Sequence, residues 1–229
     1  AGKMGQVALK SLAEYAPTPA ALAKALHLPG SLKQHEEIYR RIEAKLQREP
    51  VEDFRIDFED GYGNRPDEEE DKHARLAADE VAAGMASQSL PPFIGIRIKP
   101  FNEELVQRSI RTLDQFLTQL VSKTGGRLPS NFGVTIPKVT LAQQVSTLVE
   151  ILGVMEKRLG LANGALKFEI MVETPQSILN PQGASPLAQL ISLSEGRCVA
   201  AHFGVYDYTA SVNITASYQE MDHQACDLA

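Results

Sequence analysis

Residues 168–175 read Phe168-Glu169-Ile170-Met171-Val172-Glu173-Thr174-Pro175. A short β-rich run, residues 168–172, is followed directly by the carboxylate of Glu173, two positions before Pro175. Segments with helical periodicity separate this run from others like it. Strand–helix alternation of this kind predicts right-handed βαβ units and a parallel sheet. Four further runs lie at residues 54–58, 93–98, 132–136 and 199–203, and successive runs start between 31 and 39 residues apart.

The segments between these runs predict helices. Apolar residues fall largely on one face over residues 105–120 and again over residues 145–152. The acidic run at residues 67–71 is expected to open a helix, because carboxylates suit the positive end of the helix dipole. Each of the runs at residues 54–58, 93–98 and 132–136 is therefore followed by a helix, as a βαβ arrangement requires.

The first part of the chain differs from the rest. Residues 3–15 and 31–48 each have a helical pattern, and no strand is expected before Phe54. We therefore expect a helical segment over residues 1–52 and a partial (β/α) barrel over residues 53–229, which together form one domain.

Two parallel architectures fit this order of elements. A doubly wound parallel sheet of five strands would be complete within 229 residues. A (β/α)8 TIM-type barrel typically takes about 250 residues and eight strands, so its first and last strands would be missing here. A glycine-rich dinucleotide fingerprint does not follow the first run, because Glu59-Asp60-Gly61-Tyr62-Gly63 lacks the G-x-G-x-x-G spacing.

Composition excludes several classes of function. The chain has 23 Lys and Arg against 29 Asp and Glu, a net charge of −6, which disfavours a nucleic-acid partner because phosphate binding needs clustered cations. Apolar runs of the sequence stay well short of the roughly 18 residues of a membrane span, so we expect no membrane partner. Cys198 and Cys226 lack metal-ligand spacing and are expected to be reduced thiols in a cytoplasmic protein.

Charged residues stand at the carboxyl end of every run. In a barrel these ends converge on one mouth, where the loops after the strands build active sites. A single strand-end charge that only reaches solvent would be unremarkable, but the same feature recurs at all five ends. In chain order the ends read Asp57-Phe58-Glu59-Asp60-Gly61, Arg97-Ile98-Lys99-Pro100, Pro137-Lys138-Val139, Glu173-Thr174-Pro175 and Gly204-Val205-Tyr206-Asp207-Tyr208.

Glu173 and Asp207 are the candidate metal ligands. Mg²⁺ takes oxygen ligands and typically uses one or two carboxylates together with waters and substrate oxygens. Glu59 and Asp60 follow the run at residues 54–58 and are expected to lie within reach of the waters bound to such a metal. His202 lies in an apolar run and is expected to be a core histidine with satisfied hydrogen bonds.

Together, the five strand ends resemble the citrate lyase beta-subunit-like family, also called the HpcH/HpaI aldolase family, in order and spacing across residues 53–210. The family's segments D-[LF]-E-D, R-[IV]-N, P-K-V, [IV]-E-T and F-G-x-x-D are each similar to one end. The resemblance implies a phosphoenolpyruvate/pyruvate-type (β/α)8 barrel with Mg²⁺ (or Mn²⁺) held by Glu173 and Asp207. It also implies that Arg97 binds a substrate carboxylate or enolate oxygen.

The resemblance further implies carbon–carbon lyase or aldolase chemistry on a 2-oxo acid or an acyl-CoA, through a metal-stabilised enolate. We expect Glu59 or Asp60 to orient a metal-bound water as the base, and Lys138 to bind substrate. A Schiff base on Lys138 is a minor alternative. The second hypothesis is a non-catalytic or regulatory barrel that binds a carboxylate ligand, and the third is a doubly wound phosphate-binding enzyme, for which a glycine-rich loop is lacking.

The chain also departs from the family pattern. Lys99 stands where the family has Asn, which is expected to change a polar contact at the wall of the mouth. The helical stretch before Phe54 is longer than in ordinary lyases, so we expect a divergent member with its own substrate. The barrel's first strand would precede Ala1 and its last strands would follow Ala229. We therefore expect either a longer functional protein or assembly with partners, as a homo-oligomer.

Overall fold

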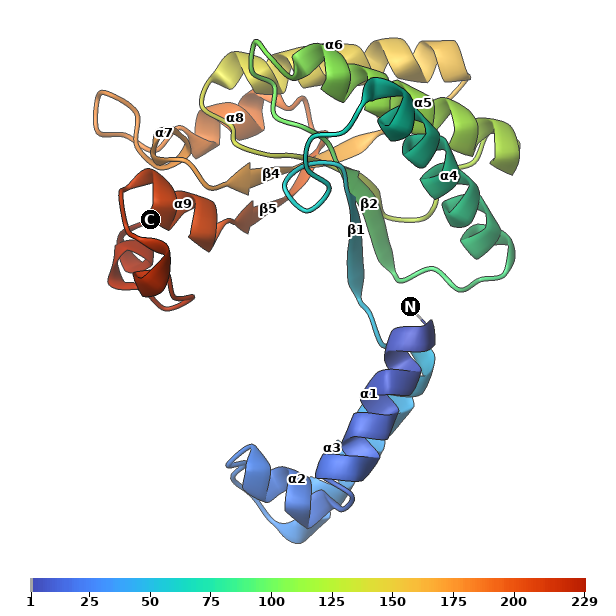
Figure 1. The fold of residues 1–229 in the computed structure, drawn as a ribbon, viewed down its shortest axis with the longest axis vertical. Helices are drawn as coiled ribbons and strands as arrows, with labels where there is room; N and C mark the ends of the chain where they lie inside the picture. Colours follow the sequence, from blue (N-terminus) through green and yellow to red (C-terminus); the bar gives the residue numbers. More distant parts are fainter. Residues whose placement is uncertain (1) are drawn as a thin grey trace. The chain divides into compact units, whose positions relative to one another are not determined.

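A computed structural model describes residues 2–229, in which five strands alternate with helices and form one parallel sheet (Figure 1). The ends of every observed strand lie within one residue of those of a predicted run, which confirms the five predicted strands. The strands are β1 (Asp53–Asp57), β2 (Phe93–Arg97), β3 (Phe132–Ile136), β4 (Lys167–Val172) and β5 (Cys198–Phe203).

The order of the strands decides between the two predicted architectures. The sheet runs β1-β2-β3-β4-β5, so each strand lies beside the next one along the chain. A doubly wound sheet reverses its strand order at a switch point, whereas a barrel adds strands in sequence. The fold is therefore a partial barrel, and the doubly wound alternative is wrong. In the parallel register Ile136 pairs with Ile170, and Val172 pairs with Phe203.

Helices follow the strands as predicted. Figure 1 shows α4, α5, α6 and α8 on one side of the sheet, and the short α7 and α9 after the carboxyl ends of β4 and β5. None of the helices within residues 2–229 combines the length and apolarity needed to cross a membrane. The helices are α4 (Asp67–Ala86), α5 (Val106–Thr124), α6 (Ala142–Leu159), α7 (Pro175–Ile178), α8 (Leu187–Leu193) and α9 (Val205–Ser211), with 3-10 turns at Ala216–Tyr218 and Gln224–Leu228.

The core lies between the sheet and these helices. All five residues of β3 are buried, as expected for a parallel strand covered on both faces. On α5, Leu113, Phe116, Leu117 and Leu120 are fully buried, which confirms the apolar face predicted from the sequence. Phe116 also stacks on Phe132 with ring centroids 5.8 Å apart.

The other face of the sheet carries a polar cluster. Glu169 accepts hydrogen bonds from Nε and Nη2 of Arg55, each at 2.7 Å, and one from the Thr135 hydroxyl. His202 Nε2 lies 3.0 Å from Glu169 Oε2, and 42% of the His202 side chain is exposed. The expectation of a buried core histidine is wrong, because β5 is an edge strand of the five-stranded sheet and its side chains are only partly covered.

The chain divides into two compact units. The first comprises residues 1–54 and 84–94, and the second comprises residues 55–83 and 95–229. The first unit contains the predicted N-terminal helices and one further helix between them. A capping box at Ser31 and Gln34 starts the longest of the three. These helices are α1 (Gly2–Tyr15), α2 (Pro19–Ala25) and α3 (Leu32–Arg48).

Candidate active site

Charged side chains from all five strand ends meet within the second unit. Their contacts form one connected network, which is what convergence on a barrel mouth predicts. Every site residue predicted from the sequence belongs to it, and two further residues join them, Asp57 and Gly204. The predicted members are Glu59, Asp60, Arg97, Lys138, Glu173 and Asp207.

Arg97, the last residue of β2, is held by Asp57 at the end of β1. Its Nε and Nη2 donate to the two carboxylate oxygens of Asp57 at 2.7 and 2.6 Å, and its Nη1 lies 3.2 Å from Glu59 Oε2. Burial alone would raise the pKa of Asp57, but the Arg97 bonds and two backbone amides hold it below its usual value. The planar fork of Arg97 is therefore engaged by Asp57, and Nη1 is the donor that faces Glu59.

The loop after β1 is a tight turn built on Asp57. The Asp57 carboxylate accepts the backbone N–H of Glu59 at 2.9 Å and that of Gly61 at 2.8 Å. A Cβ on Gly61 would lie 2.6 Å from Asp57 Oδ2, so glycine is needed there for the close approach. This turn directs Glu59 and Asp60 toward Lys138. Asp57 stands in the quoted motif, but its spacing alone did not mark it as a site residue.

Lys138, after β3, bonds carboxylates at the other strand ends through both its side chain and its backbone. Its Nζ bonds Glu59 Oε1, donates to Asp60 Oδ2 at 2.7 Å and lies 3.4 Å from Asp207 Oδ1. Its φ is +50°, a left-handed conformation that is uncommon for residues other than glycine and is often found at functional sites. Burial disfavours the charged amine, but the bonds to Asp60 and Glu59 outweigh it and raise the pKa of Lys138. Lys138 is therefore held as an ammonium.

Glu173 is buried at the end of β4 with half of its carboxylate unused. Its side chain is 1% exposed, and Oε1 accepts the Lys138 backbone N–H at 2.7 Å. Oε2 has no hydrogen-bond partner among the described residues. Burial raises the pKa of Glu173 to about 7, and the charges of Asp207 and Glu59 add to that effect. A buried carboxylate oxygen without a partner is costly, so the arrangement suits an additional cation or proton.

Gly204 makes room for Glu173. A Cβ at this position would lie 2.5 Å from Glu173 Oε2 and 2.6 Å from Glu173 Cβ, closer than real atoms approach. The glycine after β5 is therefore required by the carboxylate beside it. Because this requirement depends on a contact between two strands, the position of Gly204 in the sequence did not reveal it.

Glu173 and Asp207 together fit a hard divalent cation. Asp207 lies in the first turn of α9, where its side chain is 36% exposed and open to solvent. The unpartnered oxygen of Glu173 and the surrounding carboxylates suit Mg²⁺, which uses one or two carboxylates plus waters. Among residues 2–229, groups of three or more His, Cys, Asp or Glu side chains arranged around a common metal position are not found. A metal here would therefore rest on two protein carboxylates.

A cavity of about 320 Å³ adjoins the network. It lies between the loop after β1 and the segment after β2, and Glu59, Asp60 and Lys138 form part of its wall. Its volume is at the lower end of the range of small-molecule sites. These three residues therefore face a space large enough for a small substrate, whereas Arg97, Glu173 and Asp207 do not line it.

A parallel sheet in sequential order, with charged residues at its carboxyl edge, places the protein in the class of α/β barrels. Within that class, the chain belongs to the family described as domain of unknown function (DUF6986), whose sequence profile matches residues 1–229. No curated protein matches the chain.

Solved structures show the same fold. A citrate lyase from Burkholderia xenovorans LB400 is 21% identical, with a TM-score of 0.59 over 86% of this chain and 53% of that one. A Haloferax volcanii malate synthase in a lead(II) complex is 17% identical, with a TM-score of 0.55 over 69% of this chain and 43% of that one. Its pyruvate/acetyl-CoA ternary complex aligns with a TM-score of 0.51. The chain spans about half the length of these proteins, and identities this low establish the fold alone.

Proposed function

We propose that this protein is a metal-dependent carbon–carbon lyase or aldolase that acts on a 2-oxo acid or an acyl-CoA through an enolate. The observation that carries the proposal is the buried Glu173 oxygen without a partner, beside Asp207 at the barrel mouth. The similar folds belong to a citrate lyase and a malate synthase, and the latter forms complexes with lead(II) and with pyruvate and acetyl-CoA. These ligands support a divalent cation and an acyl or 2-oxo acid substrate.

Glu173 and Asp207 would hold Mg²⁺ or Mn²⁺. When bound, the cation supplies positive charge that polarises a substrate carbonyl and stabilises the oxygen charge of an enolate. This role of the two residues rests on their chemistry and position and is tested below.

Arg97 and Lys138 would supply the fixed positive charge of the protein itself. Nη1 of Arg97 is directed to Glu59 and can reach a substrate oxygen on the same side, while Asp57 fixes the guanidinium plane. Lys138 adds an ammonium near Asp207. Both cations would bind a carboxylate or carbonyl oxygen and stabilise its charge as the carbon–carbon bond breaks.

Glu59 is the candidate for proton transfer. It is 6% exposed, and burial raises its pKa above the ordinary value for a glutamate, against the opposing effect of Lys138. A carboxyl group with a raised pKa exchanges protons more readily near neutral pH. Asp60, whose pKa is lowered because the bonds to Lys138 outweigh its burial, would remain charged and hold the ammonium in place.

The geometry gives little support to a Schiff base. A nucleophilic lysine needs a lowered pKa in a desolvated pocket. The carboxylates of Glu59 and Asp60 act in the opposite direction on Lys138. We therefore keep the metal-dependent route.

One observation favours the alternative of a non-catalytic barrel that binds a carboxylate ligand. The fork of Arg97 is engaged by Asp57, and the ammonium of Lys138 is engaged by Glu59 and Asp60. Substrate would have to compete with these internal pairs. Ligand binding without turnover would identify this alternative.

The test is turnover against a panel of 2-oxo acids and acyl-CoA thioesters with Mg²⁺, with and without EDTA. We expect carbon–carbon cleavage that EDTA abolishes, and a large loss in Arg97→Lys, because a point ammonium cannot replace a planar fork. Cleavage that survives EDTA, with borohydride trapping substrate on Lys138, would refute the metal mechanism. The homo-oligomer expected from the sequence remains a prediction, which light scattering can check.

A further inference from the structure

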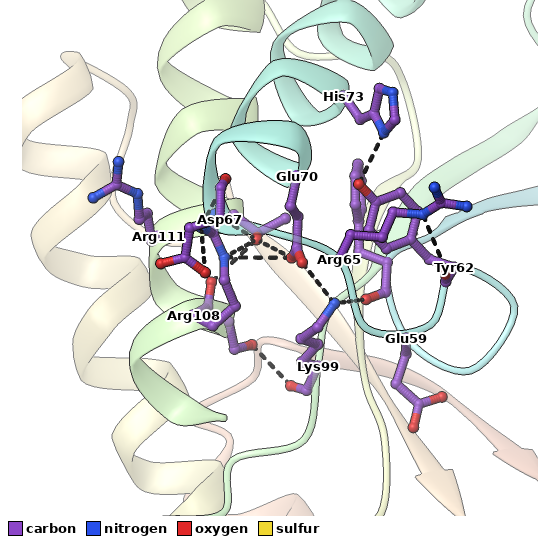
Figure 2. Close-up of polar contacts among 12 residues, drawn as sticks. Glu59, Tyr62, Arg65, Asp67, Glu70, His73, Lys99, Arg108 and Arg111 are labelled. Carbon is purple, nitrogen blue, oxygen red and sulfur yellow. Dashed lines mark hydrogen bonds and ion pairs between the residues drawn. The ribbon is translucent and has the colours of Figure 1, made fainter. Parts of the chain in front are cut away.

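Lys99 lies two residues after Arg97, where its ammonium is buried beneath the loop that carries Glu59 and Asp60. The residue is 4% exposed, and its Nζ donates to the backbone carbonyl of Phe58 at 2.6 Å (Figure 2). Phe58 directly precedes Glu59, and its own N–H donates to the Arg97 carbonyl at 2.9 Å. Phe58 is therefore bonded to Arg97 and Lys99 at the end of β2 through both its N–H and its carbonyl oxygen.

The same ammonium reaches a second point of the loop. Lys99 Nζ lies 5.1 Å from the ring centroid of Tyr62, within the range of a cation–π contact. The Tyr62 hydroxyl is 2.8 Å from His73 Nδ1 on α4, and the ring also lies beside Phe58. Lys99 thus contacts both ends of the turn that contains Glu59 and Asp60.

A buried carboxylate on α4 holds the Lys99 side chain in place. Glu70 Oε2 lies 2.8 Å from Lys99 Nζ, and the Glu70 side chain has no exposed surface. The Thr112 hydroxyl donates to Glu70 Oε1 at 2.5 Å, and Arg108 lies 3.5 Å from the same oxygen. Figure 2 shows Lys99 directed to Glu70 of α4, with Arg108 of α5 also beside Glu70. Such a desolvated pair holds its geometry only if both partners are present.

We propose that Lys99 is a positioning residue, which fixes the turn at residues 58–62 through the Phe58 carbonyl and so sets the position of Glu59 and Asp60 at the mouth. Its effect on catalysis rests on the proposed function, whereas its effect on the turn does not. A neutral Asn would be too short to reach both Glu70 and the loop. The Lys99–Glu70 pair therefore links α4 to the charged network, and Lys99 also lines the cavity beside it.

The test compares two variants of the full chain. Wild type is the reference, and Glu70→Gln, which keeps Lys99 but leaves its buried charge without the counter-ion, reports the effect of losing the pair alone. Lys99→Met/Glu70→Gln removes the donor without leaving a buried charge unpaired. Hydrogen–deuterium exchange is measured at the amides of residues 60–63, which bond within the turn, and at residues 132–136 of β3 as an internal reference.

We expect exchange at residues 60–63 to be about tenfold faster or more in the double variant than in wild type, with β3 unchanged, because a hydrogen bond from a charged donor is lost. With an active substrate, kcat falls by about tenfold in the double variant while Mg²⁺ affinity stays within about twofold, since Glu173 and Asp207 are untouched. Should the double variant not fold, Lys99→Gln/Glu70→Gln replaces it.

Equal protection of the turn in the double variant and in wild type would overturn the inference, and so would a loosened turn with unchanged kcat. If the wild-type chain turns over nothing in the panel, the proposed function fails. The exchange comparison then decides on its own whether Lys99 fixes the turn.

Discussion

Two buried glutamates, one within β4 and one just after it, have pKa values shifted in opposite directions. Glu169 lies within β4 and Glu173 lies just after its end, four residues further on, and their exposed fractions are 2% and 1%. Burial would raise the pKa of Glu169, but bonds from Arg55, Thr135 and His202 lower it to about 2. Burial raises the pKa of Glu173 to about 7, and the single backbone N–H of Lys138 does not reverse that shift.

The difference shows that partners, rather than burial, separate a structural carboxylate from a candidate functional one. Both oxygens of Glu169 accept from Arg55, so its charge is compensated inside the fold. One oxygen of Glu173 is left without a partner and two further carboxylates, Asp207 and Glu59, raise its pKa. A site that must accept a cation has to keep such capacity unused.

The largest effect on stability is expected at Glu169. Glu169→Gln should lower the free energy of unfolding by about 3 kcal/mol or more, because it removes a buried negative charge that accepts two hydrogen bonds from Arg55. Urea unfolding measures the loss. The double variant Arg55→Met/Glu169→Gln is the control and should recover much of the stability. Equal stability of Glu169→Gln and wild type would show that the pair contributes nothing.

Acid should weaken the same contact. The folded pKa of Glu169 lies below its unfolded value of about 4.5, so its stabilisation is present above that pH and is lost as the pH falls toward 2. We expect this residue to account for about 2 kcal/mol of the stability lost between about pH 6 and pH 3. Urea midpoints of wild type and Glu169→Gln at both pH values provide the comparison. Parallel losses in the two proteins would contradict it.

Gly204→Ala should produce a smaller loss of stability, together with a loss at the mouth. The added Cβ would collide with Glu173, and overpacking of this kind costs about 1–3 kcal/mol. Thermal unfolding gives the stability, and calorimetric titration of Mg²⁺ gives the binding. Gly153→Ala, where a Cβ would meet its nearest neighbour at 3.8 Å, is the matched control. Unchanged Mg²⁺ affinity in Gly204→Ala would separate Gly204 from the Glu173 site.

The smallest effect on stability, within about 1 kcal/mol of wild type, is expected for Glu173→Gln, because a neutral amide relieves a buried charge that the fold does not compensate. The same variant should lose the heat of Mg²⁺ binding. Glu150→Gln, an exposed substitution on α6, controls for the change of charge. Equal Mg²⁺ affinity in Glu173→Gln and wild type would remove Glu173 from the proposed metal site. Strong destabilisation would show that Glu173, like Glu169, is a structural carboxylate.

Most of the fold could be predicted from the sequence, because it depends on local patterns. Each strand is a short apolar run such as residues 132–136, and each following helix has an apolar face, so neither needs knowledge of the rest of the chain. The charges at the strand ends were equally visible, and convergence of parallel strands brought Glu173 and Asp207 to one mouth. The strand order, which excluded the doubly wound sheet, had to come from the structure.

What the sequence did not reveal depends on contacts between distant residues. The bond of Asp57 to Arg97, the space that Gly204 leaves for Glu173 and the burial of Lys99 beneath the loop after β1 all join separate modules. His202 was misplaced for the same reason, since an apolar run does not tell whether its strand lies at the edge of the sheet. The roles of the site residues remain predictions that the experiments above address.

The left-handed backbone of Lys138 makes its two tasks separable by protein engineering. The main-chain N–H supports Glu173, while the ammonium serves Glu59, Asp60 and Asp207. Glycine and asparagine adopt this conformation with less strain than other residues, so either can replace Lys138 while the amide stays in position. Position 138 is thus a place where the charge of the mouth can be changed by substitution while the main-chain N–H that supports Glu173 is kept.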